Sequence, residues 1–187
     1  MTTPLTYAQE NRERHLNELK SFLEIPSVST QPQHAADVAT AAHWVADAMQ
    51  EAGLEHVAVI KTDGHPLVYA DWLHAGADAP TVLIYGHYDV QPAEPFDLWE
   101  TPPFTPTIRD DYVYARGASD DKGQAFIHVK AVQAHLAANG RLPINVKFIM
   151  EGEEESGGAS LTAFIPQHKE LLKADFALVS DTGMISK

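Results

Sequence analysis

Residues 81–89 read TVLIYGHYD, a nearly unbroken apolar run that passes directly into a glycine, a histidine and an aspartate. Pro80 precedes the run and Gly86 ends it. A short apolar run between such turn signals predicts a strand that is buried on both faces, as in a parallel sheet. His87 and Asp89 then follow the carboxyl end of this strand, where open α/β sheets place their functional sites.

Strands and helices are expected to alternate on both sides of this run. Apolar residues at helical spacing predict four helices, over residues 6–24, 35–53, 122–138 and 161–172. Short apolar runs predict further strands, at residues 56–60, 67–72, 112–115, 145–150 and 176–179. Pro166 is expected to kink or split the last helix, and the proline-rich residues 91–107 are expected to form an ordered loop or a coil excursion. This order predicts an α/β three-layer sandwich, with a mixed, mainly parallel sheet and helices on both faces.

The composition is that of a soluble globular protein. Apolar residues make up 44% of the 187 residues and charged residues 21%. A net charge of -13 argues against nucleic acid and anionic membranes as partners, because both are bound by basic surfaces. The chain starts without an apolar signal segment and has no membrane-length apolar stretch, so we expect a cytoplasmic protein. Because there are no cysteines, any zinc site must use histidine and carboxylate ligands.

Three further polar motifs lie at the ends of predicted strands or at the start of a predicted helix. They are RGASDDKG at 116–123, EGEEESGG at 151–158 and SDT at 180–182. Each motif alone has an ordinary interpretation, as a turn, a helix N-cap or a solvated charge run. Neighbouring residues of an extended chain point in different directions. The two glutamates 154 and 155 can therefore do different work, one as a general base and one as a metal ligand.

The four motifs together indicate more than each one alone. Parallel strands would bring six side chains to one rim of the sheet: His87, Asp89, Asp120, Glu154, Glu155 and Asp181. Five carboxylates in one cleft would raise each other's pKa, and divalent cations would relieve that repulsion. One imidazole nitrogen of His87 can bind a metal while the Asp89 carboxylate accepts the N–H of the other. Two metals bridged by a carboxylate are a hydrolytic arrangement, with an unligated glutamate taking the proton.

The motifs GHYDVQP, RGASDDKG, EGEEESGG and SDT resemble the signature stretches of the cocatalytic zinc peptidase and deacylase family. That family includes carnosinase-type dipeptidases, aminoacylase, acetylornithine deacetylase and succinyl-diaminopimelate desuccinylase. The stretch VQPAEPFDLWETPPF, at residues 90–104, is similar to the dipeptidase branch. The resemblance covers nearly the whole chain and implies the fold of the family's catalytic domain.

The resemblance implies a metal ligand at four positions. His87 and Asp181 would bind the first metal, and Asp120 would bridge both metals. Glu155 would bind the second metal. The bond between Asp120 and Asp121 would be a cis peptide. The ions would be two divalent metals, zinc first, with manganese and cobalt as alternatives.

The resemblance also implies roles for two residues that bind no metal, and a reaction. Glu154 would be the general base, and Asp89 would be the partner that orients His87. The reaction would be hydrolysis of the peptide bond of a dipeptide. One alternative is removal of the acyl group from an N-acyl amino acid, and another is a metal-binding fragment without activity.

Residues 1–187 would form the N-terminal portion of the catalytic domain, because family members are about twice as long. The resemblance implies a lid and dimerisation domain and a late metal-binding histidine that these residues lack. The second metal would then have only Asp120 and Glu155, fewer than the three protein ligands usual for catalytic zinc. We therefore expect these residues alone to be weakly active or inactive, and the complete protein to be a homodimer.

Overall fold

Strand β3 (Thr81–His87) lies inside a five-stranded sheet in the computed structural model, which describes residues 2–183. The strand order is β1 (Glu55–Ile60), β2 (Leu67–Trp72), β6 (Asn145–Glu151), β3 and β7 (Phe176–Val179). β3 pairs in parallel with β6 and with β7, whereas β2 pairs antiparallel with β6 and with β1. Only β2 is therefore antiparallel to the other four strands. The expected mixed, mainly parallel sheet is confirmed.

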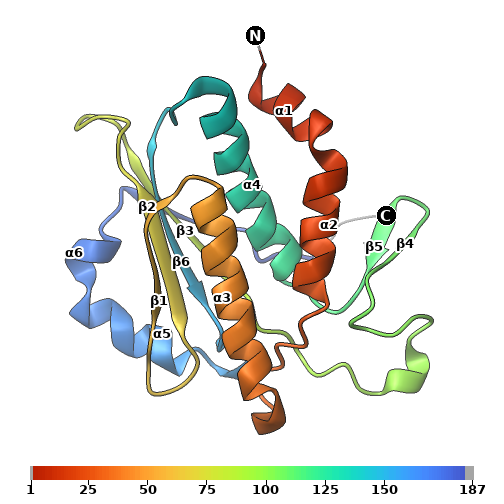
Figure 1. Cartoon of the computed structure of the whole chain (residues 1–187). Coiled ribbons are helices and arrows are strands. Elements are labelled where there is room, and N and C mark those ends of the chain that lie inside the picture. The colour runs from red at the N-terminus through yellow and green to blue at the C-terminus, as the bar shows by residue number, and fades with distance from the viewer. Residues whose placement is uncertain (1, 184–187) are drawn as a thin grey trace.

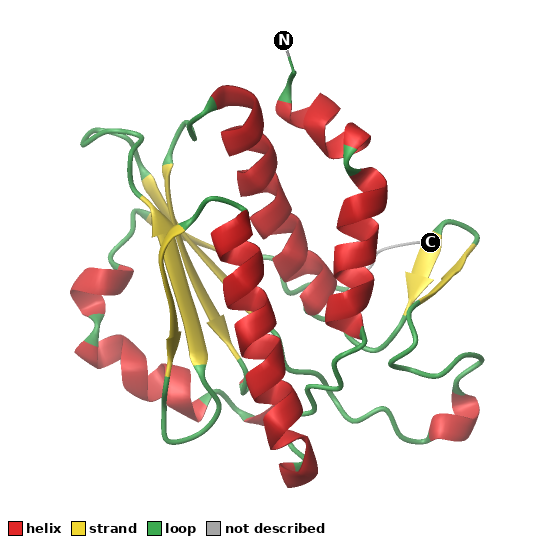
Figure 2. Cartoon of the chain, viewed as in Figure 1, coloured by secondary structure: helices red, strands yellow, loops and turns green. Residues whose placement is uncertain are grey.

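Helices cover both faces of the sheet, as Figure 1 and Figure 2 show. One face carries α1 (Pro4–Glu10), α2 (Arg12–Leu23), α3 (Ala35–Glu51) and α4 (Lys122–Asn139), and the other carries α5 (Ala159–Phe164) and α6 (Lys169–Leu172). A hydrophobic cluster lies on each face of the sheet, and alternate side chains of β3 pack into one cluster or the other. Ile84 packs in the cluster with α3 and α4, and its neighbours Leu83 and Tyr85 pack in the cluster with α5 and α6. The expected three-layer sandwich is confirmed.

Two predicted helices are interrupted in the structure. The helix predicted over 6–24 is two helices, because the backbone leaves the helical conformation at Asn11, with φ -101° and ψ 11°. The Asn11 side chain donates a hydrogen bond to the carbonyl of Tyr7 (2.9 Å), a local bond that competes with helix continuation. The helix predicted over 161–172 splits at Pro166 as expected, with a 3-10 turn at Ile165–Gln167 between α5 and α6.

The proline-rich segment forms the excursion expected from the sequence, with one addition. It contains a 3-10 turn at Phe96–Leu98 and leads into a separate two-stranded sheet of β4 (Thr107–Arg109) and β5 (Tyr112–Tyr114). The sequence predicts β5 but not β4, since a strand of three residues is too short to show an alternating pattern. The two aspartates at 110 and 111 make the turn, at φ values of 48° and 66° that aspartate tolerates.

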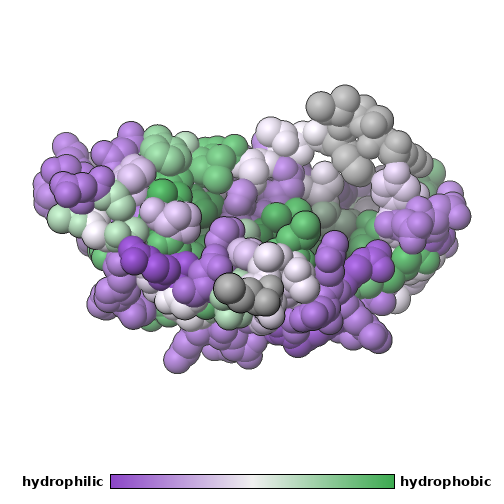
Figure 3. Space-filling view, turned by 90° about the horizontal axis from the view of Figure 1, so that it is seen from above, coloured by the Kyte–Doolittle hydropathy of each residue, from purple (hydrophilic) through white to green (hydrophobic). Residues whose placement is uncertain are grey.

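Hydrophilic residues surround much of the face drawn in Figure 3, and hydrophobic residues appear between them. Within the described part of the chain, every helix is too short or too polar to cross a bilayer.

A buried lysine fixes the start of α4 against the end of α2. Lys122 is fully buried, and its Nζ donates hydrogen bonds to the carbonyls of Phe22 (3.0 Å) and Ile25 (2.7 Å). The ammonium group also lies 4.8 Å from the centre of the Phe22 ring. These two carbonyls also accept the backbone N–H groups of Ile25 and Ser27, so Lys122 is an additional donor where α2 ends. The contacts of Lys122 also fix the position of Asp120 and Asp121, which directly precede it.

The segment that follows α2 lies beside the end of β3. Ser27 Oγ donates to the carbonyl of Tyr88 (2.6 Å), and the amide of Val90 donates to the carbonyl of Ser27 (3.0 Å). Val28 and Val90 form an isolated parallel bridge. The chain beyond His87 is therefore held on a defined path, although it has left the sheet.

Gly123 has no room for a side chain, because a Cβ atom at this position would overlap the backbone carbonyl oxygen of Ala118. We expect Gly123→Ala to lower the free energy of unfolding by about 1–3 kcal/mol, because the backbone at Ala118 or at residue 123 would have to move to make room for the methyl group. Urea denaturation followed by circular dichroism measures this change. Gly183→Ala is the matched control, because no atom of the described residues lies within 4 Å of a Cβ atom there. An equal loss in both variants would contradict the steric explanation.

Candidate metal centre

The sheet topology brings the predicted site residues to one rim. His87 is the last residue of β3, and Asp181 lies just beyond β7. Glu154 and Glu155 begin a 3-10 turn (Glu154–Ser156) that follows β6. Asp120 precedes the start of α4. Because β6, β3 and β7 are parallel neighbours, their carboxyl ends meet, as the sequence predicts.

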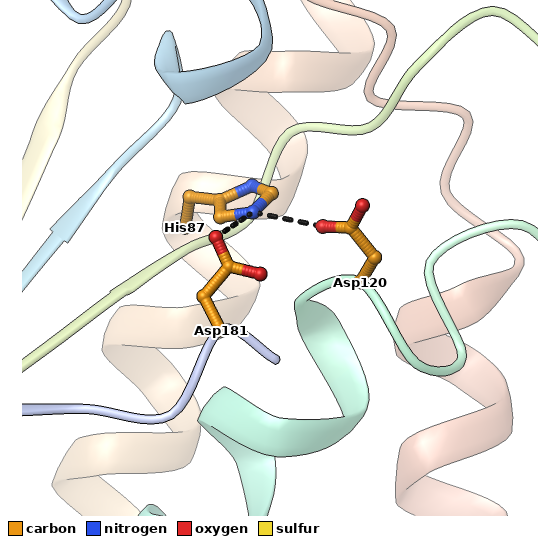
Figure 4. A group of neighbouring side chains, drawn as sticks. All are labelled: His87, Asp120 and Asp181. Carbon is orange, nitrogen blue, oxygen red and sulfur yellow. Dashed lines mark hydrogen bonds and ion pairs between the residues drawn. The ribbon is translucent and has the colours of Figure 1, made fainter. Parts of the chain in front are cut away.

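His87 faces two aspartates with one of its ring nitrogens (Figure 4). Its Nε2 atom lies 3.1 Å from Oδ1 of Asp120 and 3.6 Å from Oδ2 of Asp181. The side chain of His87 is fully buried, whereas the side chains of Asp120 and Asp181 are 60% and 28% exposed. The imidazole therefore forms the floor of the cluster, and the two carboxylates approach it from the solvent side.

The other ring nitrogen faces Asp89 as expected, but its hydrogen bond goes to the backbone carbonyl oxygen of Asp89 and not to the carboxylate. His87 Nδ1 lies 3.1 Å from the Asp89 carbonyl oxygen and 3.3 Å from its Oδ1 atom. Asp89 Oδ2 accepts hydrogen bonds from the hydroxyl of Ser29 (2.5 Å) and from the amide of Glu155 (3.1 Å). Both side chains of the His87–Asp89 pair are fully buried. Asp89 therefore lies at Nδ1 while Nε2 faces the other carboxylates, the arrangement usual for metal-binding histidines.

The two adjacent glutamates form a second group around the same histidine. One ligand atom from each of His87, Glu154 and Glu155 lies within 4.8 Å of the other two. Glu155 also accepts a hydrogen bond from the side-chain amide of Gln91. Burial raises the pKa of Glu155; the hydrogen bond from Gln91 lowers it in part, and the charge of Asp120 raises it again.

The aspartate pair before α4 has the backbone that the resemblance implies, since the Asp120–Asp121 bond is cis. The Asp121 carboxylate turns inward, and its Oδ2 atom accepts the backbone N–H of His87 (3.0 Å). Burial raises the pKa of Asp121 to about 6, although the hydrogen bond from His87 opposes that rise. Asp121 therefore supports the backbone of His87, while Asp120 faces its ring.

The charge balance of the cluster favours a bound cation. Burial by itself lowers the pKa of His87, but Asp89, Asp121 and Asp120 together raise it to about 10. Among residues 2–183, none of the lysine and arginine side chains forms an ion pair with the carboxylates of this cluster. A divalent cation bound beside His87 would offset the charge of the surrounding acids.

The residues present fit a divalent metal ion. The two groups offer only imidazole nitrogen and carboxylate oxygen, which zinc, manganese and cobalt all accept. Oδ1 of Asp121 is also buried without a hydrogen-bond partner in the described part of the chain, so the acids are not fully satisfied by protein donors.

The structure places all six predicted residues at one rim of the sheet. The sequence did not predict the residues that hydrogen-bond to them. Ser29 and Gln91 contact Asp89 and Glu155 directly. Ser29 lies 60 residues from its partner in the sequence, and nothing in its local pattern points to that contact. Gln91 belongs to the VQP stretch, so its place next to the histidine motif is a usable signal.

Comparisons with known proteins agree with this geometry. The model of peptidase family M20/M25/M40 matches residues 83–186. A cysteinylglycine-S-conjugate dipeptidase from Corynebacterium striatum is 35% identical over 177 residues, which are 94% of this chain and 38% of that protein. The crystal structure of human carnosine dipeptidase 1 superposes with a TM-score of 0.88 and 33% identity, over 98% of this chain and 41% of that one.

A third similar protein is the metallo-carboxypeptidase Sso-CP2 of Sulfolobus solfataricus. Its structure superposes with a TM-score of 0.81 and 37% identity, over 91% of this chain and 38% of that chain. The present chain thus spans about two fifths of the length of the relatives it matches. The family match covers more than half of the chain, and it includes His87 and the three motifs that follow it. By sequence and by fold, this chain belongs to peptidase family M20/M25/M40.

Proposed function

We propose that this chain is part of a metal-dependent dipeptidase that hydrolyses the peptide bond of a small peptide. The observation that carries the proposal is the buried His87, whose Nε2 atom faces Asp120 and Asp181 and which also lies close to Glu154 and Glu155. The names of the three similar proteins support the substrate class, because two of the three are dipeptidases.

Two divalent ions, zinc in the first instance, would be held by four side chains. His87, Asp120 and Asp181 would bind the first ion, and Asp120 would bridge to a second ion at Glu155. When bound, the ions would supply Lewis acidity toward water and toward the carbonyl of the scissile bond. The proximity of His87 to both aspartates supports the first position more directly than the second.

Glu154 would act as the general base. It lies close to His87 and Glu155, and the family resemblance gives it no metal to bind, so its carboxylate would be free to take a proton from the attacking water. The same carboxyl group can then give that proton to the departing amine. Asp89 would hold His87 in the tautomer that leaves Nε2 free for a metal, since it faces Nδ1.

The proposal extends to the whole protein through the family resemblance. Residues 1–187 would be the N-terminal portion of the catalytic domain, acting in the cytoplasm. A further domain would provide the lid and the contacts of a homodimer. A histidine outside these residues would complete the second metal position, which has fewer ligands here than the first. Most of the activity would then depend on the protein at its natural length.

Metal binding tests the first part of the proposal. We expect isothermal titration of the 187-residue chain with zinc to show one tight equivalent, and zinc to raise its melting temperature. His87→Gln should weaken this binding by at least about 100-fold, beyond the effect of losing an outer partner. His56→Gln is the control, because its exposed ring pairs with Asp71 away from the cluster. Two equally tight equivalents, or none, would contradict the assignment of ligands.

Catalysis tests the second part, in the protein that carries this sequence at its natural length. We expect Glu154→Gln to lower kcat for a dipeptide by about 10²–10⁴-fold, because the proton acceptor is lost. Zinc affinity should remain within a few-fold of the unmodified protein. Glu170→Gln, on the exposed surface of α6, is the control and should change neither quantity.

The choice of substrate separates the proposed reaction from its alternative. The zinc-loaded protein should cleave a dipeptide faster than an N-acetyl amino acid. The opposite preference would make the protein a deacylase, and no turnover of either substrate would refute the proposal.

A further inference from the structure

The position of Asp181 needs an explanation, because little of the sheet supports it. β7 is an edge strand with a single neighbour, β3, among the described residues. Its side chains are exposed, with Phe176 at 51% and Val179 at 54%. Asp181 follows this strand in a segment without regular secondary structure. A segment of this kind is expected to move unless other contacts hold it.

Two side chains on one face of α4 supply such contacts. Gln124 and His128 are one helical turn apart, so both can face the same neighbour. The side-chain amide of Gln124 donates to the carbonyl of Thr182 (2.9 Å). The Nε2 atom of His128 lies 2.8 Å from the hydroxyl oxygen of Ser180. Asp181 therefore lies between two residues that are each bonded to α4.

Gln124 also reaches the second aspartate of the cluster through the backbone. Its Nε2 atom donates to the carbonyl of Ser119 (2.6 Å), and the Ser119 carbonyl directly precedes Asp120. Its Oε1 atom accepts a weaker bond from the hydroxyl of Thr182 (3.3 Å). One amide group thus ties together the two segments that carry Asp120 and Asp181.

We infer that Gln124 is a positioning residue that sets the separation of Asp120 and Asp181, with His128 as a second tether. The inference rests on the proposed function, in which these two aspartates bind the first metal. Gln124 would not contact the ion. It would act through the carbonyls of Ser119 and Thr182, so that both carboxylates already face His87 Nε2 before a metal arrives.

This arrangement should affect metal affinity more than folding. Without the tethers, the segment after β7 would have to be ordered when the metal binds, and the affinity would fall by the free energy of that ordering. Partners that orient metal ligands typically change metal affinity by about 10–100-fold when they are removed. The fold would lose only partly exposed hydrogen bonds, which contribute modestly to stability.

The decisive variant is Gln124→Met, which keeps the length of the side chain and removes its hydrogen-bonding groups. We expect its zinc affinity, measured by isothermal titration of the 187-residue chain, to fall by about 10–100-fold. The visible absorption of bound cobalt should also change, since the geometry of the ligands would be altered. Gln133→Met, the same substitution on the same helix but bonded to the carbonyl of Glu51, is the matched control. Unchanged affinity and spectrum in Gln124→Met, or equal losses in both variants, would overturn the inference.

A second measurement needs no metal. Hydrogen exchange of the metal-free chain, followed by mass spectrometry, should show faster exchange in peptides covering residues 176–183 for Gln124→Met and not for Gln133→Met. His128→Leu, which removes the other tether, should have the same effect and provides a reading if Gln124→Met does not fold. Unchanged exchange in the folded variants would contradict the tether.

The two measurements also separate this inference from the proposed function. If the unmodified chain binds no divalent metal while Gln124→Met raises exchange at residues 176–183, the proposed metal site is wrong and the tether is supported. If the unmodified chain binds zinc and neither tether variant changes affinity or exchange, the metal site is supported and the positioning role is wrong.

Discussion

The buried imidazole of His87 has acidic groups at both of its nitrogen atoms, and the surrounding elements serve to keep this contact in place. β3 carries the ring to the rim of the sheet. The 3-10 turn after β6 and the start of α4 bring the acids to it. The segment after α2 supports Asp89 through Ser29. These segments, together with the residues after β7 that carry Asp181, converge on one ring, where their carboxylates lie close enough to interact strongly.

Much of this arrangement could be predicted, because it follows from local patterns. The unbroken apolar run at 81–85 indicates a central strand, and parallel strands end at the same edge. The polar motifs after β3, β6 and β7 therefore had to meet. The cis bond between Asp120 and Asp121 is implied by the family resemblance alone, and nothing in helix or strand periodicity indicates it.

The remaining features depend on contacts that local patterns do not encode. The break at Asn11 comes from a side chain that bonds a carbonyl of the preceding turn, within a stretch whose spacing is helical. Ser29 and Gln124 meet their partners only after the chain has folded, over separations of 60 and 58 residues. Both belong to common polar types that are usually exposed, so their roles are visible only in three dimensions.

Among residues 2–183, β7 pairs on one side only, and this has a consequence for handling the 187-residue chain. An edge strand presents a row of unpaired amide and carbonyl groups, which can pair with a strand of another molecule. Here that row runs beside exposed apolar side chains, including Phe176 and Val179. The net charge of -13 opposes such association by mutual repulsion. We therefore expect the solubility of the 187-residue chain to fall when salt screens, or acid neutralises, its carboxylates, with β7 as the edge through which copies associate.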